Sequence, residues 1–246
     1  MESLRDQIWL RTERTRSFRI EQPDRVELEA ITMPEGRVYR TPDGTFPSVT
    51  TVLGKVPDDD PTWREEWIAK VGQEEADRVL GSAGSRGSEV HKIAEAYVTG
   101  EEWQKGFMPV NVSAFRKLQP LIDARVGTVR GLEFPLWSRR LRTAGRTDLV
   151  CDWNNIPSIV DFKTARRRKS RESIWKYFVQ AAAYAIMYRL RTGLNIENTV
   201  VAVIPDDGHP LVYVEKVSDW VGKVADVYMT QRPAFTLTLP SGESVS

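Results

Sequence analysis

Cysteine and histidine are scarce in this chain, and their scarcity excludes several classes of site. Among 246 residues there is one cysteine, Cys151, and there are two histidines. A disulfide framework within the chain is therefore excluded, as is a four-cysteine zinc or iron–sulfur site. No histidine lies near Cys151 in the sequence, so we interpret this residue as a small apolar filler rather than a catalytic thiol.

Long apolar runs are also missing. No stretch approaches the ~20 apolar residues that a membrane-spanning helix needs. The first residues lack the apolar run of a secretory signal, and acids at Glu2, Asp6 and Glu13 argue against a transit peptide. We therefore expect a soluble cytoplasmic protein that makes no contact with a membrane.

The overall charge gives no sign of a polyanionic partner, because the net charge is only +1. Any surface for nucleic acid must then come from local clusters of basic residues. The length fits one catalytic domain. We expect a charged extension over residues 1–25, a single domain over 26–235 and a tail over 236–246.

Turn residues and apolar periodicity divide the chain into helices and strands. Asp43-Gly44 marks a hairpin turn within residues 38–51, and 57–61 reads as an acidic loop. We interpret the sequence GSAGSRG at 81–87 as a flexible loop between two helices, the second of which Ser88 caps. Helices are expected at about 62–80, from 88, 112–126, 171–190 and, capped by Ser218, 218–229.

Strands are expected in two groups. They cover about 129–137, 146–153, 157–163, 199–204 and 210–217. Asn154-Asn155 supplies the tight turn between the second and third strands. From residue 88 the expected order is helices, three strands, a helix, a strand pair and a helix. This order predicts an α/β (α+β) fold with a mixed central β-sheet flanked by helices and an added N-terminal helical region.

Two acids and a lysine form the most informative cluster. Strand periodicity places Asp161 and Lys163 on one face of a strand, with Phe162 on the other. A hairpin through Asn154-Asn155 would bring Asp148 beside them. Paired carboxylates bind Mg²⁺ or Mn²⁺, which can polarise a phosphate and activate water, while an ammonium can orient that water or stabilise the transition state. The trio therefore suits phosphodiester hydrolysis.

Taken alone, an aspartate and a lysine two positions apart are typical of a solvated strand edge. Their flanks change this interpretation, since Ile159-Val160 is apolar and predicts a central strand. Charges at the end of a central strand need a reason. Gln180 also needs a reason, because it is a polar residue in an otherwise apolar helix, where it shares one face with Tyr184. It could have a role in the site, or it could form a hydrogen bond that only fixes the packing of the helix.

Four short motifs in order resemble the RecB-like branch of the PD-(D/E)xK nuclease superfamily. They are Gly87 with His91, Gly145 with Asp148, Asp161 with Lys163, and Gln180 with Tyr184. Upstream, FPSVTTVL at 46–53 and Trp67 with Val71-Gly72 look like phage and mitochondrial genome-maintenance exonucleases. The resemblance covers about 46–217 and implies a restriction-endonuclease-like core at about 87–230.

The resemblance implies roles for individual residues. His91, Asp148, Asp161 and the Phe162 carbonyl would bind Mg²⁺ or Mn²⁺, and Lys163 would be catalytic together with the two aspartates. Gln180 and Tyr184 would align the lysine and contact the DNA backbone, and Glu133 would be an outer ligand. Thr147 stands where the family name has proline. The iron–sulfur cluster of many relatives is excluded here because Cys151 is the one cysteine.

Basic residues gather on both sides of the acids. The segment KTARRRKSR at 163–171 holds six basic residues and no acid, and Arg139, Arg140, Arg142 and Arg146 precede Asp148. Charge runs are usually solvated, but two runs that flank one acidic pair fit a groove for a phosphate backbone. We expect DNA contacts from Arg86, Arg146, Arg166, Arg167 and Arg168.

These observations favour a metal-dependent DNA exonuclease that acts on single-stranded or frayed ends in replication, recombination or repair. One alternative is a structure-specific or restriction-like endonuclease on the same fold. The other is a non-catalytic DNA-binding module, against which the complete set of Asp148, Asp161 and Lys163 argues. DNA is the expected partner, and replication or recombination proteins are further expected partners. The expected location is a bacterial or phage-infected cell, a mitochondrion or a nucleoid.

Overall fold

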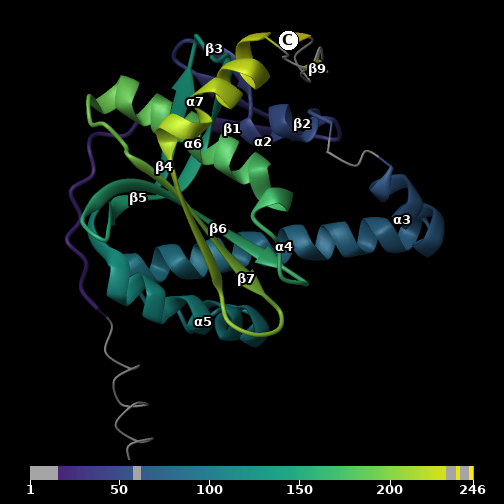
Figure 1. Ribbon diagram of the computed structural model, residues 1–246, viewed down its shortest axis with the longest axis horizontal. Coiled ribbons are helices and arrows are strands. Elements are labelled where there is room, and N and C mark those ends of the chain that lie inside the picture. Colours follow the sequence, from purple (N-terminus) through teal and green to yellow (C-terminus); the bar gives the residue numbers. More distant parts are fainter. Residues whose placement is uncertain (1–15, 58–61, 231–236, 239–243, 246) are drawn as a thin grey trace, which may run out of the picture.

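A computed structural model describes residues 16–57, 62–230, 237–238 and 244–245 of the chain (Figure 1). Most of the expected extension at 1–25, the acidic loop at 57–61 and the tail at 236–246 therefore lies outside the described residues. Side chains are described up to Met229, except those of Trp63 and Arg64.

The centre of the molecule is a five-stranded mixed sheet. Its strands are β4 (Val126–Ser138), β5 (Thr143–Trp153), β6 (Ile156–Ala165), β7 (Asn198–Pro205) and β8 (Leu211–Lys216), in the order β4-β5-β6-β7-β8. All neighbours are antiparallel except β6 and β7, which are parallel. Asn154 and Asn155 turn the chain between β5 and β6 with φ values of 51° and 66°, a conformation that asparagine tolerates. The expected strands and this turn are confirmed.

Helices cover both faces of the sheet (Figure 1). One face packs on α4 (Gln73–Thr99) and α5 (Pro109–Arg125), and the other on α6 (Trp175–Thr192) and α7 (Val217–Ala225). Residues alternate along β6 as strand geometry requires: Val160 and Phe162 join the core beneath α4 and α5, and Ile159 joins the core beneath α6. The predicted mixed α/β fold is confirmed.

Short helical turns flank the second layer. A 3₁₀ turn, Glu172–Ile174, precedes α6, and a π-helical turn, Asp226–Thr230, follows α7. Ser218 was expected to cap this last helix, but the N-cap is Lys216, and the Ser218 hydroxyl donates to Asp219 instead. The cap prediction was wrong because α7 begins at Val217, directly after β8, so Ser218 lies inside the helix.

A smaller sheet stands beside the central one. It contains β1 (Glu29–Met33), β2 (Gly36–Thr41) and β3 (Gly44–Pro47), and the helix α2 (Val49–Gly54) follows. The expected hairpin is present, with Pro42-Asp43 between the paired residues Thr41 and Gly44. A further strand pair joins β9 (Leu237–Thr238) to β10 (Ser244–Val245).

The predicted loop at 81–87 was wrong. Helix α4 runs unbroken through GSAGSRG for 27 residues, and the break falls instead at Gly72, between α3 (Trp63–Val71) and α4. Gly72 has a φ of 85°, which favours glycine. Figure 1 shows α3 and the N-terminal part of α4 projecting beyond the central sheet. Ser88, expected as an N-cap, lies inside this helix.

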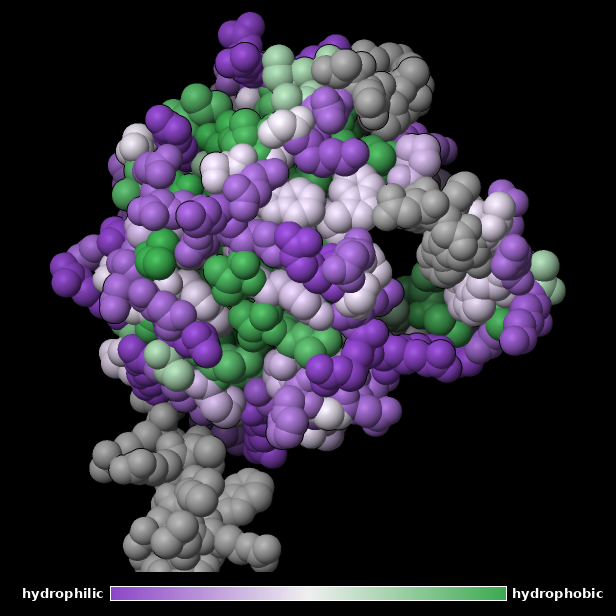
Figure 2. Space-filling model, viewed as in Figure 1, coloured by the Kyte–Doolittle hydropathy of each residue, from purple (hydrophilic) through white to green (hydrophobic). Residues whose placement is uncertain are grey.

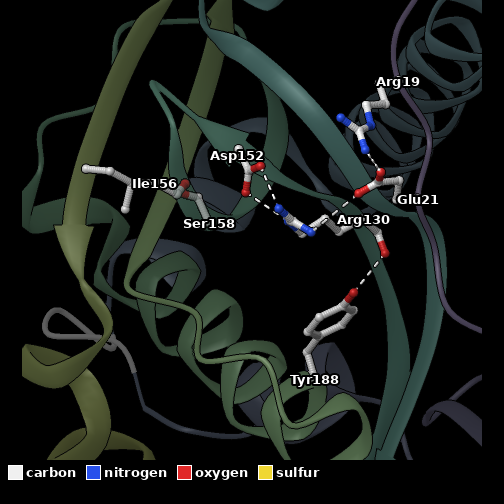
Figure 3. A network of polar contacts seen from close by, with 7 residues as sticks. All are labelled: Arg19, Glu21, Arg130, Asp152, Ile156, Ser158 and Tyr188. Atoms are coloured by element: carbon white, nitrogen blue, oxygen red, sulfur yellow. Dashed lines mark hydrogen bonds and ion pairs between the residues drawn. The ribbon is translucent and has the colours of Figure 1, made fainter.

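A segment near the N-terminus covers the edge strand β4. Backbone hydrogen bonds join Glu21 N to Val129 O and Val129 N to Arg19 O. Figure 3 shows how side chains hold this segment: Arg130 forms two hydrogen bonds of 2.8 Å with Asp152 and lies 3.9 Å from Glu21. Tyr188 donates to the Arg130 carbonyl at 2.8 Å, which ties α6 to the same point. Covering an edge in this way protects it from pairing with other strands.

The exterior is mostly hydrophilic on the face shown in Figure 2, where hydrophobic side chains gather in several separate patches. Among the described residues, no helix combines the length and the apolar character that crossing a bilayer requires.

Candidate metal and nucleic-acid site

A cavity of about 730 Å³ opens where the central sheet meets the smaller sheet. One wall comes from the strands β4, β5 and β6 with the helices α4 and α6, and the other from β1, β2 and α2. The sequence-predicted residues that line it are His91, Glu133, Arg146, Asp148, Phe162, Lys163, Gln180 and Tyr184. Residues from five separate segments of the chain therefore meet in one place.

Asp148, Phe162 and His91 form one side of the site. The Phe162 amide donates to Asp148 Oδ2 at 2.8 Å, and His91 Nε2 lies 2.7 Å from the Phe162 carbonyl oxygen. His91 Nδ1 is 3.4 Å from Asp148 Oδ1. The hairpin between β5 and β6 produces this arrangement, since Leu149 pairs with Val160 and the next positions are Asp148 and Asp161.

Glu133 completes an oxygen- and nitrogen-rich cluster. Ligand atoms of His91, Glu133 and Asp148 lie within 4.8 Å of one another. The register of β4 and β5 explains this, because Glu133 falls between the pairs Leu132–Leu149 and Phe134–Thr147, level with Asp148. Its φ is 43°, which is uncommon for a residue other than glycine. Such strain is frequent at functional sites.

Asp161 and Lys163 form a second group just behind the first. Lys163 Nζ lies 2.6 Å and 2.5 Å from the two carboxylate oxygens of Asp161, and Gln180 donates to Asp161 Oδ1 at 3.1 Å. The side chain of Asp161 is 3% exposed, whereas that of Lys163 is 20% exposed and reaches the cavity. The two residues share a strand face, as the period of the strand predicts.

Close packing places Tyr184 against Gly145. A Cβ atom at residue 145 would overlap the Tyr184 hydroxyl, so the absence of a side chain there lets the tyrosine reach the cavity. Burial raises the pKa of Tyr184 well above its ordinary value, and its hydroxyl stays protonated.

Burial and crowded acids also shift the carboxyl groups. Desolvation, reinforced by the neighbouring Asp148, raises the pKa of Glu133 to about 7. Desolvation raises the pKa of Asp161 to about 6, although Lys163 opposes the shift. Burial alone would lower the pKa of Lys163, but the Asp161 and Asp148 carboxylates outweigh it, and the pKa is raised. Lys163 is therefore a cation at neutral pH.

The donor set fits a hard divalent cation. Asp148, Glu133 and the Phe162 carbonyl offer oxygen atoms, and His91 adds an imidazole nitrogen. Mg²⁺ and Mn²⁺ prefer oxygen ligands, which are the majority of the donors in this set. The pKa of Glu133 is raised because acidic groups crowd together in a buried place. Such a raised pKa is expected where a bound cation would balance the negative charge of its ligands.

Residues 48–217, more than half of the chain, match the family model of the PD-(D/E)XK nuclease superfamily. The chain belongs to this superfamily. Membership indicates a metal-dependent nuclease, and the mixed sheet with helices on both faces agrees with the restriction-endonuclease-like fold.

Comparison with other proteins adds little to this. No curated protein matches the chain. A crystal structure from Eubacterium rectale named "Putative exonuclease" is similar at 14% identity and a TM-score of 0.38. The similarity covers 59% of this chain and 65% of that one. The superfamily assignment therefore rests on the family model.

The arginines expected to contact DNA do not all lie at the cavity. Arg146 lines the cavity and forms an ion pair of 2.9 Å with Glu27. Arg86 does not line this cavity, because its guanidinium pairs with Asp206 at the end of β7. Arg166, Arg167 and Arg168 follow β6 on the exposed surface beyond the cavity.

The second wall was not found as a site from the sequence. Arg37 and Thr51 line the cavity opposite the acids, yet they lie about 100 residues from Asp148 along the chain. The motif at 46–53 was the available signal, since it contains Ser48 and Thr51. Ser48 caps α2 through a 2.9 Å hydrogen bond from the Thr51 amide.

Proposed function

We propose that this nuclease-superfamily member is a Mg²⁺- or Mn²⁺-dependent DNA exonuclease of the RecB-like branch that acts on single-stranded or frayed ends. The observation that carries the proposal is the meeting of His91, Glu133 and Asp148 in one cavity with Lys163, which pairs with the buried Asp161. Both the acidic cluster and the adjacent cation are needed for phosphodiester hydrolysis.

Each group has a defined task in this proposal. A divalent cation bound here would supply polarisation of the scissile phosphate and a lowered pKa of a bound water. His91, Asp148, Asp161 and the Phe162 carbonyl would hold that cation, with Glu133 as a further ligand. Lys163 stays protonated and places its ammonium against the phosphate, where negative charge grows in the transition state. Asp161 and Gln180 fix the position of that ammonium.

The shape of the cavity supports a single strand as substrate. Helix α4 contributes only small side chains and His91 to the cavity wall, namely Ala83, Gly84, Gly87, Ser88 and His91. The backbone of α4 therefore comes close to β6, and the added Cβ of residue 87 would lie 3.7 Å from Thr164 Oγ1. The smaller sheet closes the opposite side. A strand lying between these two walls leaves little room for its complement.

A closed single-stranded DNA circle separates the two modes of cleavage. An exonuclease leaves the circle intact and degrades the same sequence once it is made linear. An endonuclease opens the circle, which would overturn the exonuclease proposal in favour of the restriction-like alternative. The experiment uses Mg²⁺ and Mn²⁺ in parallel, and intact linear DNA in both would favour a non-catalytic DNA-binding module.

We also propose a role for this exonuclease activity in DNA metabolism. Removal of single-stranded ends is a step of DNA replication, recombination and repair, and proteins of those processes are the proposed partners. We also propose that residues 26–235 form one nuclease domain in a bacterial or phage-infected cell, or in a nucleoid or mitochondrion.

A further inference from the structure

The second wall of the cavity carries no role in hydrolysis, yet it faces the metal ligands. Thr32, Gly36, Arg37 and Thr51 belong to it. They come from the β1–β2 hairpin and the helix α2, which lie outside the central sheet. A wall that faces the reacting centre without contributing to it is placed to hold the substrate.

Arg37 differs from the other cations that line the cavity. Lys163 is paired with Asp161, and Arg146 is paired with Glu27. Over residues 16–57 and 62–230, no carboxylate lies within ion-pair distance of Arg37. Its side chain is exposed at the cavity. The charge of Arg37 is therefore available to an anion.

The backbone of Arg37 is fixed from both sides by α2. The Arg37 amide donates to Thr51 Oγ1 at 2.8 Å, and the Thr51 hydroxyl donates to the Arg37 carbonyl at 3.0 Å. The Ser48 amide donates to the same carbonyl at 2.8 Å. Gly36 permits this approach, because its φ is 146° and a Cβ atom there would overlap Thr51.

The side chain of Arg37 is also oriented before any ligand arrives. Its Nε atom donates to Thr32 Oγ1 on the neighbouring strand at 3.2 Å. This bond leaves the two terminal amino groups of the guanidinium for another acceptor. A guanidinium held in this way matches the geometry of two phosphate oxygens and loses little entropy on binding them.

We propose that Arg37 binds a backbone phosphate of the DNA strand next to the scissile phosphate. The inference rests on the proposed function, since it takes the scissile phosphate to lie at His91, Asp148 and Lys163. Arg37 holds the strand from the opposite wall and reads no base, because a phosphate contact fixes register without sequence information. Thr51 is a positioning residue for this arginine.

Binding of a labelled single-stranded oligonucleotide tests the contact. Fluorescence anisotropy with Ca²⁺, a cation that also prefers oxygen ligands, gives the dissociation constant over a series of salt concentrations. We expect Arg37→Ala to weaken binding about tenfold. We also expect it to reduce the slope of log K against log salt by about 0.7, the loss of one phosphate contact. In cleavage assays the substitution raises KM more than it lowers kcat.

Matched variants separate this contact from general electrostatics. Arg40→Ala removes an exposed arginine of the same strand that pairs with Glu29 and does not line the cavity. It should leave the dissociation constant within about twofold of the wild type. Thr51→Val removes the backbone clamp without changing charge and should weaken binding in the same direction, while Thr51→Ser restores it. Thermal unfolding of each variant confirms that it is folded.

Several outcomes would overturn the inference. An unchanged dissociation constant for Arg37→Ala, or an equal loss for Arg40→Ala, would do so. A loss confined to oligonucleotides with a terminal phosphate would contradict a backbone contact. If the wild type binds DNA but cleaves none with Mg²⁺ or Mn²⁺, the proposed function fails, and the binding series still decides the role of Arg37. Absence of DNA binding by the wild type would overturn both.

Discussion

Asp161 and Lys163 are the residues whose chemistry and stability are most closely linked. The carboxylate is almost fully buried, and Lys163 and Gln180 are its charge and hydrogen-bond partners. Removing one member of a buried pair leaves an uncompensated charge. Loss of Lys163 should therefore lower the stability of the fold as well as abolish cleavage.

We therefore expect Lys163→Met to abolish cleavage and to destabilise the protein by about 3 kcal/mol above neutral pH. Below pH 6 the loss should shrink, because Asp161 is then protonated in the wild type as well and the ion pair is lost from both proteins. The double variant Asp161→Asn, Lys163→Met should regain most of the lost stability while remaining inactive. Urea unfolding of the three proteins measures this. Equal stability of Lys163→Met and the wild type at pH 8 would contradict the buried pair.

Glu133 makes the metal-free protein sensitive to pH. Its pKa is raised from 4.5 to about 7 in the folded state, chiefly by burial. Between these two values the unfolded chain has lost the proton that the folded chain keeps. The contribution of Glu133 to stability is therefore fully present below pH 4.5 and is lost as the pH rises through 7.

Replacing this carboxyl group with an amide should remove the pH dependence. We expect Glu133→Gln to gain about 2 kcal/mol over the wild type between pH 5 and pH 8 in the absence of metal. Thermal unfolding at the two pH values, in buffer with a chelator, measures the difference. Glu35→Gln, which changes an exposed acid in the β1–β2 turn, is the control. A gain that is the same at both pH values would argue against a raised pKa.

Helix α4 shows where local sequence patterns mislead. The run GSAGSRG contains three glycines and is typical of a loop, but each glycine costs a helix only about 1 kcal/mol relative to alanine. The flanking turns are anchored elsewhere: Ala76 is buried near the start, and Val90, Ile93 and Tyr97 pack in the core. Tertiary packing of the two ends therefore keeps the middle helical. The glycines near the cavity let α4 approach β6.

Alanine at Gly81 tests the continuity of α4. A Cβ atom there meets no other atom within 4 Å, and the residue does not line the cavity. We expect Gly81→Ala to stabilise the protein by up to about 1 kcal/mol and to leave nuclease activity unchanged. Gly81→Pro should destabilise it by about 3 kcal/mol. Both values come from urea unfolding, and a destabilising alanine together with a neutral proline would indicate a loop.

In the molecule as a whole, the central sheet and the cavity wall that carries Asp148 and Lys163 could be predicted, whereas the second wall could not. Alternation along β6 and the Asn154-Asn155 turn are local signals. They were enough to predict that Asp148 lies beside Asp161. Glu133 was expected as an outer ligand, and the register of β4 brings its carboxylate within 4.8 Å of the ligand atoms of His91 and Asp148. Arg37 meets the site only through contacts between distant segments, which local periodicity does not record.

In the proposed mechanism, DNA cleavage by this chain requires a metal ion held at Asp148. Incubation of end-labelled single- and double-stranded DNA with Mg²⁺ or Mn²⁺, for the wild type beside Asp148→Asn, tests this requirement. The asparagine keeps an acceptor for the Phe162 amide, so the fold should be preserved. We predict cleavage by the wild type, none with a chelator, and a loss of at least about a hundredfold in Asp148→Asn. Equal cleavage by the variant, or cleavage in the presence of chelator, would contradict metal-dependent hydrolysis at Asp148.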